Sequence, residues 1–152
     1  MEKTLFLLFL LVFLWFGWGK LWPKKEAPLV SDLKIITIGN TSLSVEVAVD
    51  NEAITRGLSG REKLAEKAGL LFVFPAPGYY PFWMKEMRFP IDIIWIGADK
   101  KVVGFSENIL PESYPATFAP PSPVQYVVEV NAGWVEERGI LVGDILTLSE
   151  RL

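Results

Sequence analysis

The chain has 152 residues, of which 51% are apolar and 22% are charged, and its formal net charge is −3. This composition is typical of one globular domain and excludes an intrinsically disordered protein, and the acidic balance argues against a nucleic-acid partner. The chain contains no cysteine and no histidine, which excludes thiol catalysis, disulfides, the Ser-His-Asp triad and most zinc sites.

Residues 1–22 are predicted to be a signal-anchor or transmembrane segment. Residues 4–19 carry no charge, and a helix of that length spans roughly 24 Å, close to the ~30 Å of a bilayer core. Lys20 near the end can snorkel, and tryptophans gather there as in an interfacial belt. A cleaved signal peptide is the alternative. Both predictions place the domain on the extracytoplasmic side, anchored to the membrane in the first case and secreted in the second.

A linker and two strands are predicted next. Residues 23–32 are polar and contain proline, so we expect a tether in front of a domain at 33–152. The runs 33–39 and 43–49 are predicted strands, because valines alternate with other residues in the second run. The short segment between them fits a hairpin.

Two short helices are predicted after these strands. Asp50 or Asn51 can cap the first helix, which ends near Gly57. The second is expected over Arg61–Lys67. The apolar run 70–74 that follows is typical of a fully buried strand.

The middle of the chain is predicted to return to strands. Residues 82–87 and 91–96 are apolar runs on either side of Pro90, and the second run is expected to continue through a hairpin turn at 97–100. The proline-rich segment 106–124 is a long irregular excursion, of the kind that often carries function.

The end of the chain adds a strand at 124–130, a helical turn at 134–138 that ends at Gly139, and a strand at 144–148. The predicted fold class is therefore α+β and mainly β. We expect a compact antiparallel barrel or sandwich of about seven or eight strands with two or three short helices. A hydrophobic N-terminal helix is expected to precede it.

Asp92 is the first candidate for chemistry, because it interrupts the apolar run IDIIWI. Side chains alternate between the two faces of a strand, and here both faces are apolar, so the carboxylate is expected to be buried. A buried carboxylate needs a cation or several hydrogen-bond donors. Arg56 and Lys85 are the expected partners, and a tie to the backbone is the alternative. Lys85 is otherwise a solvated edge charge.

Glu129 is a second carboxylate within an apolar strand. Asp92 and Glu129 together could perform acid–base chemistry of the kind used in glycoside hydrolysis. That hypothesis makes the protein a carboxylate-dependent hydrolase or transferase acting on an envelope glycan. No cofactor or metal is predicted, although carboxylates alone are able to hold a hard cation.

Aromatic side chains gather around the loop 75–81 and the excursion 106–123. Such side chains suit sugar stacking or protein contact when they are exposed, and otherwise they cover the edge of a core. The candidate binding-loop aromatics are Tyr79, Tyr80, Phe82, Trp83, Tyr114 and Phe118.

Four sequence blocks occur in a fixed order: TRGLSGREKL, GLLFVFP, FWMKEMRFPIDIIWI, and YVVEVNAG followed by GILVGD. Together they resemble the DUF192 (UPF0127) family over about residues 32–150. The resemblance implies a small β-rich domain with short helices, often behind an export signal, and no established biochemical function. The motif positions that carry over are Arg56, Gly57, Trp83, Met84, Lys85, Pro90, Asp92, Glu129 and Gly133. We infer that they cluster in one site.

These observations favour an extracytoplasmic binding or accessory module over an enzyme. Its expected partners are the membrane, through the N-terminal segment, and an envelope glycan or protein. The alternatives are the carboxylate-dependent enzyme and a purely structural domain.

Overall fold

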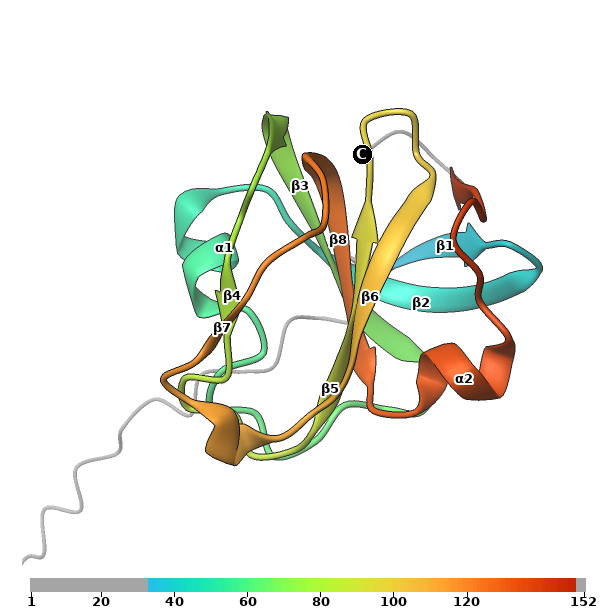
Figure 1. Cartoon of the computed structure of the whole chain (residues 1–152). Coiled ribbons are helices and arrows are strands. Elements are labelled where there is room, and N and C mark those ends of the chain that lie inside the picture. Colours follow the sequence, from blue (N-terminus) through green and yellow to red (C-terminus); the bar gives the residue numbers. More distant parts are fainter. Residues whose placement is uncertain (1–32, 150–152) are drawn as a thin grey trace, which may run out of the picture.

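The computed structural model describes residues 33–149, which form two sheets and two short α-helices (Figure 1). The predicted segment 1–22 and the linker 23–32 lie outside the described residues. The helices are α1 (Asn51–Arg56) and α2 (Trp134–Arg138), and a 3-10 turn covers Pro111–Ser113. The strands are β1 (Lys34–Ile38), β2 (Thr41–Ala48), β3 (Ala68–Gly78), β4 (Phe82–Trp83), β5 (Ile91–Ile96), β6 (Val102–Ile109), β7 (Thr117–Phe118), β8 (Val124–Asn131) and β9 (Leu146–Leu148).

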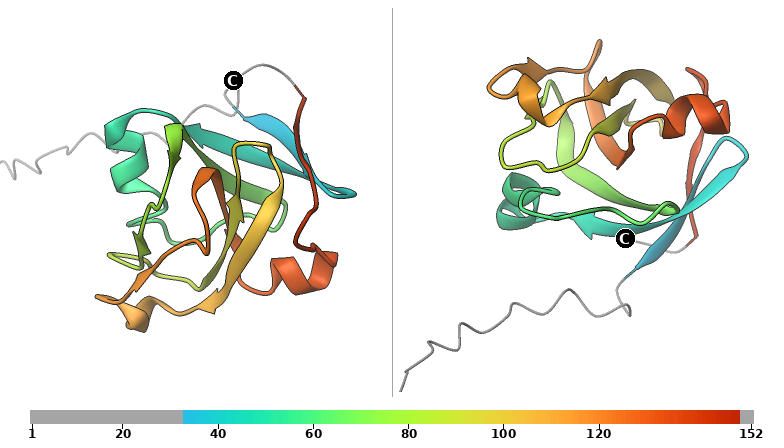
Figure 2. Two further views of the ribbon diagram at one scale, coloured as in Figure 1. Left: turned by 45° about the horizontal axis from the view of Figure 1, so that its top comes forward. Right: turned by 90° about the horizontal axis from the view of Figure 1, so that it is seen from below.

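The main sheet is a curled half-barrel. Its seven strands follow the order β6-β5-β8-β3-β2-β1-β9, and β1 and β2 run across the direction of β5 and β6 (Figures 1 and 2). The two ends of the sheet approach each other, because Lys101 and Ile145 form an isolated antiparallel bridge and the Leu146 amide donates to the Lys100 carbonyl at 2.8 Å. The prediction of a mainly β domain is confirmed.

One strand pair departs from the predicted antiparallel arrangement. β2 and β3 run parallel, with Val45 opposite Gly69. A parallel neighbour needs a crossover connection, and residues 49–67, which contain α1, provide it.

The predicted second helix at Arg61–Lys67 is not formed, since these residues have irregular structure. Their carbonyl groups bind the sheet instead of one another. The Asn131 side-chain amide donates to the carbonyls of Leu64 and Ala65 at 3.3 and 3.1 Å, and the Ser44 amide donates to the Lys67 carbonyl at 2.9 Å. Tertiary hydrogen bonds therefore replace the helical ones.

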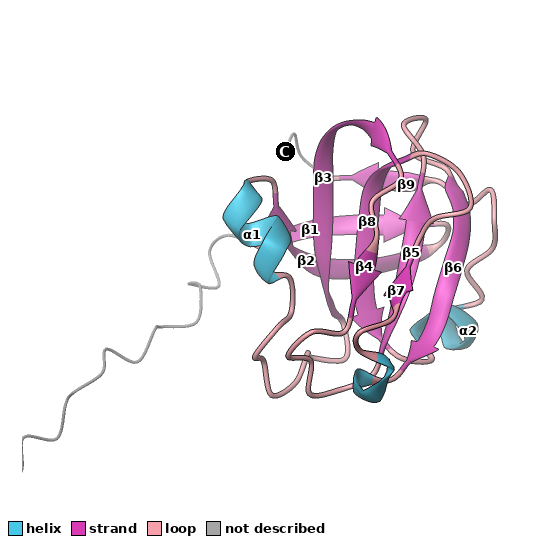
Figure 3. Ribbon diagram, turned by 60° about the vertical axis from the view of Figure 1, so that its left-hand side comes forward, coloured by secondary structure: helices cyan, strands magenta, loops and turns pink. Residues whose placement is uncertain are grey.

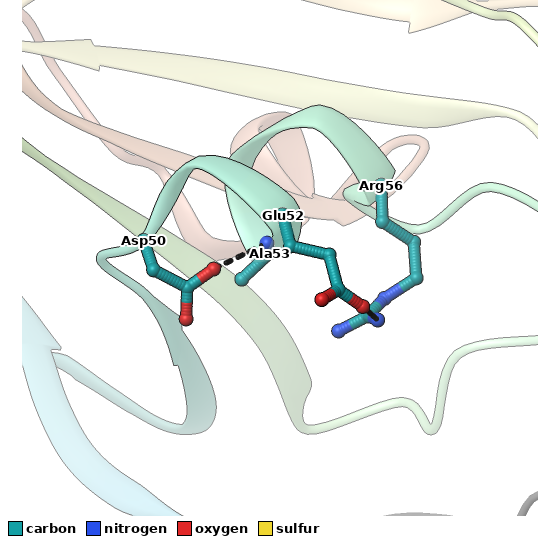
Figure 4. Close-up of polar contacts among 4 residues, drawn as sticks. All are labelled: Asp50, Glu52, Ala53 and Arg56. Carbon is teal, nitrogen blue, oxygen red and sulfur yellow. Dashed lines mark hydrogen bonds and ion pairs between the residues drawn. The ribbon is translucent and has the colours of Figure 1, made fainter.

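The first predicted helix is confirmed as α1, and local contacts explain it (Figure 4). The Asp50 carboxylate accepts a hydrogen bond from the Ala53 amide at 2.8 Å, which satisfies one of the free donors of the first turn. Glu52 and Arg56 form an ion pair at 3.0 Å one turn apart. The helix ends at Gly57, whose φ of 51° suits glycine.

The sheet carries a hydrophobic core on each face. One core contains Ile94 and Ile96 of β5 together with Trp134 and Val135 of α2. The other contains Ile91, Ile93 and Trp95 of the same strand, under α1 and β4. The predicted alternation of IDIIWI is therefore confirmed, and every residue of β5 is buried.

The small sheet brings two distant segments together. β4 pairs with β7, with Phe82 opposite Phe118, and this ribbon lies in front of the main sheet in Figure 3. Phe82 is buried and meets Trp95 of β5 edge to face at 5.4 Å. Residues 75–81 and 106–123, predicted to be irregular, thus lie on one side of the molecule, although β3 extends to Gly78 and β6 to Ile109. Within residues 33–149, no helix has the length and apolarity needed to cross a membrane.

Candidate functional site

Asp92 is fully buried and is held by two backbone amides. Its Oδ1 accepts from the Asn108 amide at 2.7 Å, and its Oδ2 accepts from the Val135 amide at 3.0 Å. Val135 lies in the first turn of α2, whose N-cap residue, Gly133, has no side chain to cap the helix. Asp92 therefore caps α2 from a neighbouring strand.

The hydrogen bond from the Asn108 amide to Asp92 lies at an irregular point in the β5–β6 pairing. Ile91 lies opposite Ile109 but Ile93 lies opposite Ser106, so the partner strand has extra residues opposite Asp92. One of them is Asn108, whose φ is 52°. Such a bulge leaves an amide without a ladder partner, and the Asp92 carboxylate satisfies it.

The expected ion pair of Asp92 with Arg56 or Lys85 is not formed. Arg56 instead pairs with Glu52, and the Lys85 ammonium lies 5.9 Å from the centre of the Trp83 ring. The two backbone amides meet the need for donors, which is the backbone tie considered as the alternative.

Asp92 and Glu129 lie on opposite faces of the sheet. Glu129 of β8 is directly opposite Ile93, whereas Asp92 is opposite Val130. Paired residues share a face and consecutive residues alternate, so the two carboxylates point away from each other. The proposed acid–base pair is therefore wrong, and the motif residues do not form one cluster.

Glu129 faces a cavity beneath the C-terminal end of α1. The cavity has a volume of about 240 Å³ and its wall includes Arg56 and Gly57. Glu129 is 5% exposed, and within the described part of the chain its Oε2 has no hydrogen-bond partner. A Cβ placed on Gly57 would lie 3.7 Å from this oxygen. A buried polar atom without a partner is rare and needs an explanation.

Burial changes the acid–base behaviour of Glu129. Removal from water raises the pKa of this carboxyl from its ordinary value of 4.5 to about 8, while the positive charge of Arg61 acts in the opposite direction. Desolvation wins because, within residues 33–149, no hydrogen-bond donor reaches Oε2 to stabilise the charged form. The carboxyl is therefore mostly protonated at neutral pH.

Arg61 and Glu46 complete the polar surroundings. Arg61 binds Glu46 through two hydrogen bonds, at 2.5 and 2.8 Å, and this bonding lowers the pKa of Glu46. The strand registers place Glu46, Leu70 and Glu129 side by side across β2, β3 and β8. Arg61 thus neutralises one carboxylate of this row, but Glu129 keeps an oxygen that has no partner in the described part of the chain.

Sequence reasoning missed Arg61 and Glu46. The sequence predicts only a short helix that starts at Arg61, and a strand in which Glu46 is one of the residues that alternate with valines. The signal available was the strand pattern VEVA at 45–48, in which a charge lies between apolar residues and needs a partner, as Asp92 does.

The predicted aromatics divide between the cavity and the surface. Tyr80, Phe82 and Trp83 line the cavity. Tyr80 stacks on Phe74 at 3.6 Å and donates its hydroxyl to the Ala76 carbonyl at 2.7 Å. Phe72, which sequence reasoning had assigned only to the core, meets Phe82 edge to face at 4.9 Å.

The other predicted aromatics, Tyr79, Tyr114 and Phe118, lie outside this wall. Trp83, which lines the cavity, is 50% exposed and meets Tyr114, which is 45% exposed, at 6.1 Å. Tyr79 is exposed, and Phe118 packs partly buried against the core. Trp83 therefore joins the cavity to an exposed aromatic surface.

A second hollow of about 280 Å³ adjoins the cavity. It shares four wall residues with the cavity and adds the charged residues Lys85 and Glu86. The shared residues are Thr55, Arg56, Ser59 and Trp83. Of the candidate polar residues, Arg56 and Glu129 thus meet at the cavity, and Lys85 lies in the outer hollow.

Within residues 33–149, no group of three or more acidic, histidine or cysteine side chains is arranged to hold a metal ion.

The sequence of the folded region decides the family. The family model of DUF192, described as "Uncharacterized ACR", matches residues 34–148. The chain belongs to the DUF192 family. The comparison with curated proteins found no match.

Two solved structures share the DUF192 fold of this chain. One is from Sinorhizobium meliloti and is described as a "putative transcription regulator"; it is 32% identical, with a TM-score of 0.73, and the match covers 77% of this chain and 94% of that one. The other, from Novosphingobium aromaticivorans, is of unknown function; it is 26% identical, with a TM-score of 0.74 and coverage of 80% and 89%. Both solved chains therefore consist of little more than this domain.

Proposed function

We propose that this DUF192 domain is an extracytoplasmic binding module that takes a small ligand into the cavity beneath α1. The observation that carries the proposal is Glu129, which lines the cavity and whose buried Oε2 has no hydrogen-bond partner among residues 33–149. An apolar pocket with a few polar groups that converge on it is the usual form of a small-molecule site. A perturbed carboxyl in such a pocket supports the same proposal.

The surroundings of the cavity support binding more than catalysis. The carboxylate expected to work with Glu129 points to the other face of the sheet. The cavity wall supplies aromatic surface, and the adjoining hollow supplies hydroxyl and charged groups for the rest of a ligand. The N-terminal segment 1–22 would hold this module at the membrane surface, where an envelope component could reach it.

Nucleic acid is a less favoured partner, although one structural relative is described as a transcription regulator. Binding to phosphates needs a clustered positive charge. This chain has a net charge of −3, and Arg56 and Arg61 are each paired with a glutamate.

Blocking the mouth of the cavity tests the proposal. Thr55 is exposed and lines both hollows, so Thr55→Trp is expected to fill the opening without disturbing a core. We expect at least one compound from a panel of aromatic alcohols, amino acids, sugars and muropeptides to raise the unfolding midpoint of residues 27–152 by several degrees. A ligand at about 100 times its Kd adds roughly 2.7 kcal/mol.

Thr147→Trp is the matched control, because Thr147 is exposed on β9 and does not line the cavity. The control should keep the shift and Thr55→Trp should lose it. A shift that survives in Thr55→Trp, or a panel that shifts nothing in the unmodified domain, would refute binding in this cavity.

A further inference from the structure

The inner cavity has walls suited to an aromatic ring. Phe72 and Phe82 stand nearly perpendicular, with an interplanar angle of 88°, and Phe74 and Tyr80 form a parallel stack. All four line the cavity. Ring faces and ring edges attract each other through their opposite partial charges, so such a wall favours another ring over an aliphatic chain.

The size of the cavity agrees with a single substituted ring. An apolar cavity of about 150 Å³ holds one benzene molecule. The volume here is about 240 Å³, which leaves room for one or two small substituents on the ring. A larger remainder would extend past Trp83 into the outer hollow, because the two hollows share that side chain.

The charges around Glu129 select the group that meets it. An ammonium group would have to approach the positive charge of Arg61, which acts on Glu129, and that of Arg56 on the cavity wall. A carboxylate would be buried against another carboxyl among aromatic walls, which is costly. A neutral hydroxyl avoids both costs, because it can donate to the ionised carboxylate and can donate to or accept from the protonated carboxyl.

We propose that the ligand of this cavity carries a neutral phenolic ring whose hydroxyl group binds the carboxyl group of Glu129. The inference rests on the proposed function and adds to it the chemical class of the ligand. The ring lies among Phe72, Phe74 and Phe82. The substituent opposite the hydroxyl leaves the cavity beside Trp83 and Thr55.

The test compares p-cresol with toluene, which differ only in the hydroxyl group, by calorimetric titration of residues 27–152. The unmodified domain should bind p-cresol at least tenfold more tightly than toluene. Glu129→Leu should bind the two compounds equally, because its side chain offers no hydrogen bond. Glu107→Gln is the control, since Glu107 is an exposed strand glutamate, and it should keep the full preference.

A second comparison needs no variant at Glu129. The compound 4-methylanisole keeps the oxygen of p-cresol but has no hydroxyl proton, and it should bind the unmodified domain several-fold more weakly than p-cresol. Equal binding of all three compounds would overturn the phenol inference and leave the binding module in place. A preference for p-cresol that persists in folded Glu129→Leu would also overturn it. Binding of none of them would overturn the inference, while the panel and Thr55→Trp decide the proposed function separately.

Discussion

Asp92→Asn should lower the free energy of unfolding by about 2–4 kcal/mol, because a buried carboxylate with two backbone donors is replaced by a group with one acceptor. Each oxygen of Asp92 accepts one amide hydrogen. An asparagine can accept only one of them, and its own NH₂ group then faces the other donor. Urea unfolding of residues 27–152 measures the loss, and α2 and the β5–β6 bulge should lose hydrogen-exchange protection first.

Asp99→Asn is the control for this substitution. Asp99 lies in the exposed hairpin turn, where it accepts from the Lys101 amide at 3.2 Å and lies 3.7 Å from the Lys101 ammonium. Its replacement should change the free energy of unfolding by no more than about 0.5 kcal/mol, as is usual for surface sites. Equal stability of Asp92→Asn and the unmodified domain would show that Asp92 does not hold these two elements.

Glu129→Gln should stabilise the domain at pH 8 and leave its stability nearly unchanged at pH 4. The pKa of Glu129 is raised in the folded state from 4.5 to about 8. Below pH 4.5 the carboxyl is protonated in both the folded and the unfolded chain. As the pH rises towards 8, the unfolded chain loses this proton while the folded domain keeps it, so stability falls across that window.

The size of the effect follows from the shift. One pKa unit corresponds to about 1.36 kcal/mol, so the gap between Glu129→Gln and the unmodified domain should grow to at most on the order of 5 kcal/mol by pH 8. Urea unfolding between pH 4.5 and 8.5 measures the gap. Glu107→Gln, at an exposed strand glutamate, is the surface control. A flat gap for Glu129→Gln would mean that Glu129 ionises normally in the folded domain.

The sequence was enough to predict a mainly β domain and the two faces of IDIIWI, because side-chain alternation is a local property. The sequence was also enough to predict α1 and the end of α2 at Gly139. The residues that cap these helix ends, Asp50, Gly57 and Gly139, are neighbours of the helices in the chain. The prediction of a helix over Arg61–Lys67 was wrong because carbonyl groups of this segment bind Asn131 and Ser44, which are far from it in sequence. Propensity cannot reveal such contacts.

The candidate site was predicted only in part, for a related reason. Burial of Asp92 and Glu129 could be predicted from the apolar residues around them. Whether their partners are cations, amides or nothing depends on strand order and on the β5–β6 bulge. That order places the two carboxylates on opposite faces and brings Arg61 to the row that contains Glu129.

The most direct test of the Glu129 ligand site is a pH titration of the Glu129 carboxyl carbon by ¹³C NMR, with and without p-cresol, in which Glu129→Gln assigns the resonance. We expect a midpoint near pH 8 in the free domain and a changed resonance when p-cresol is bound. A midpoint near 4.5 with a resonance that p-cresol leaves unchanged would contradict it, because Glu129 would then be an ordinary solvated carboxylate and not the polar contact of a ligand site.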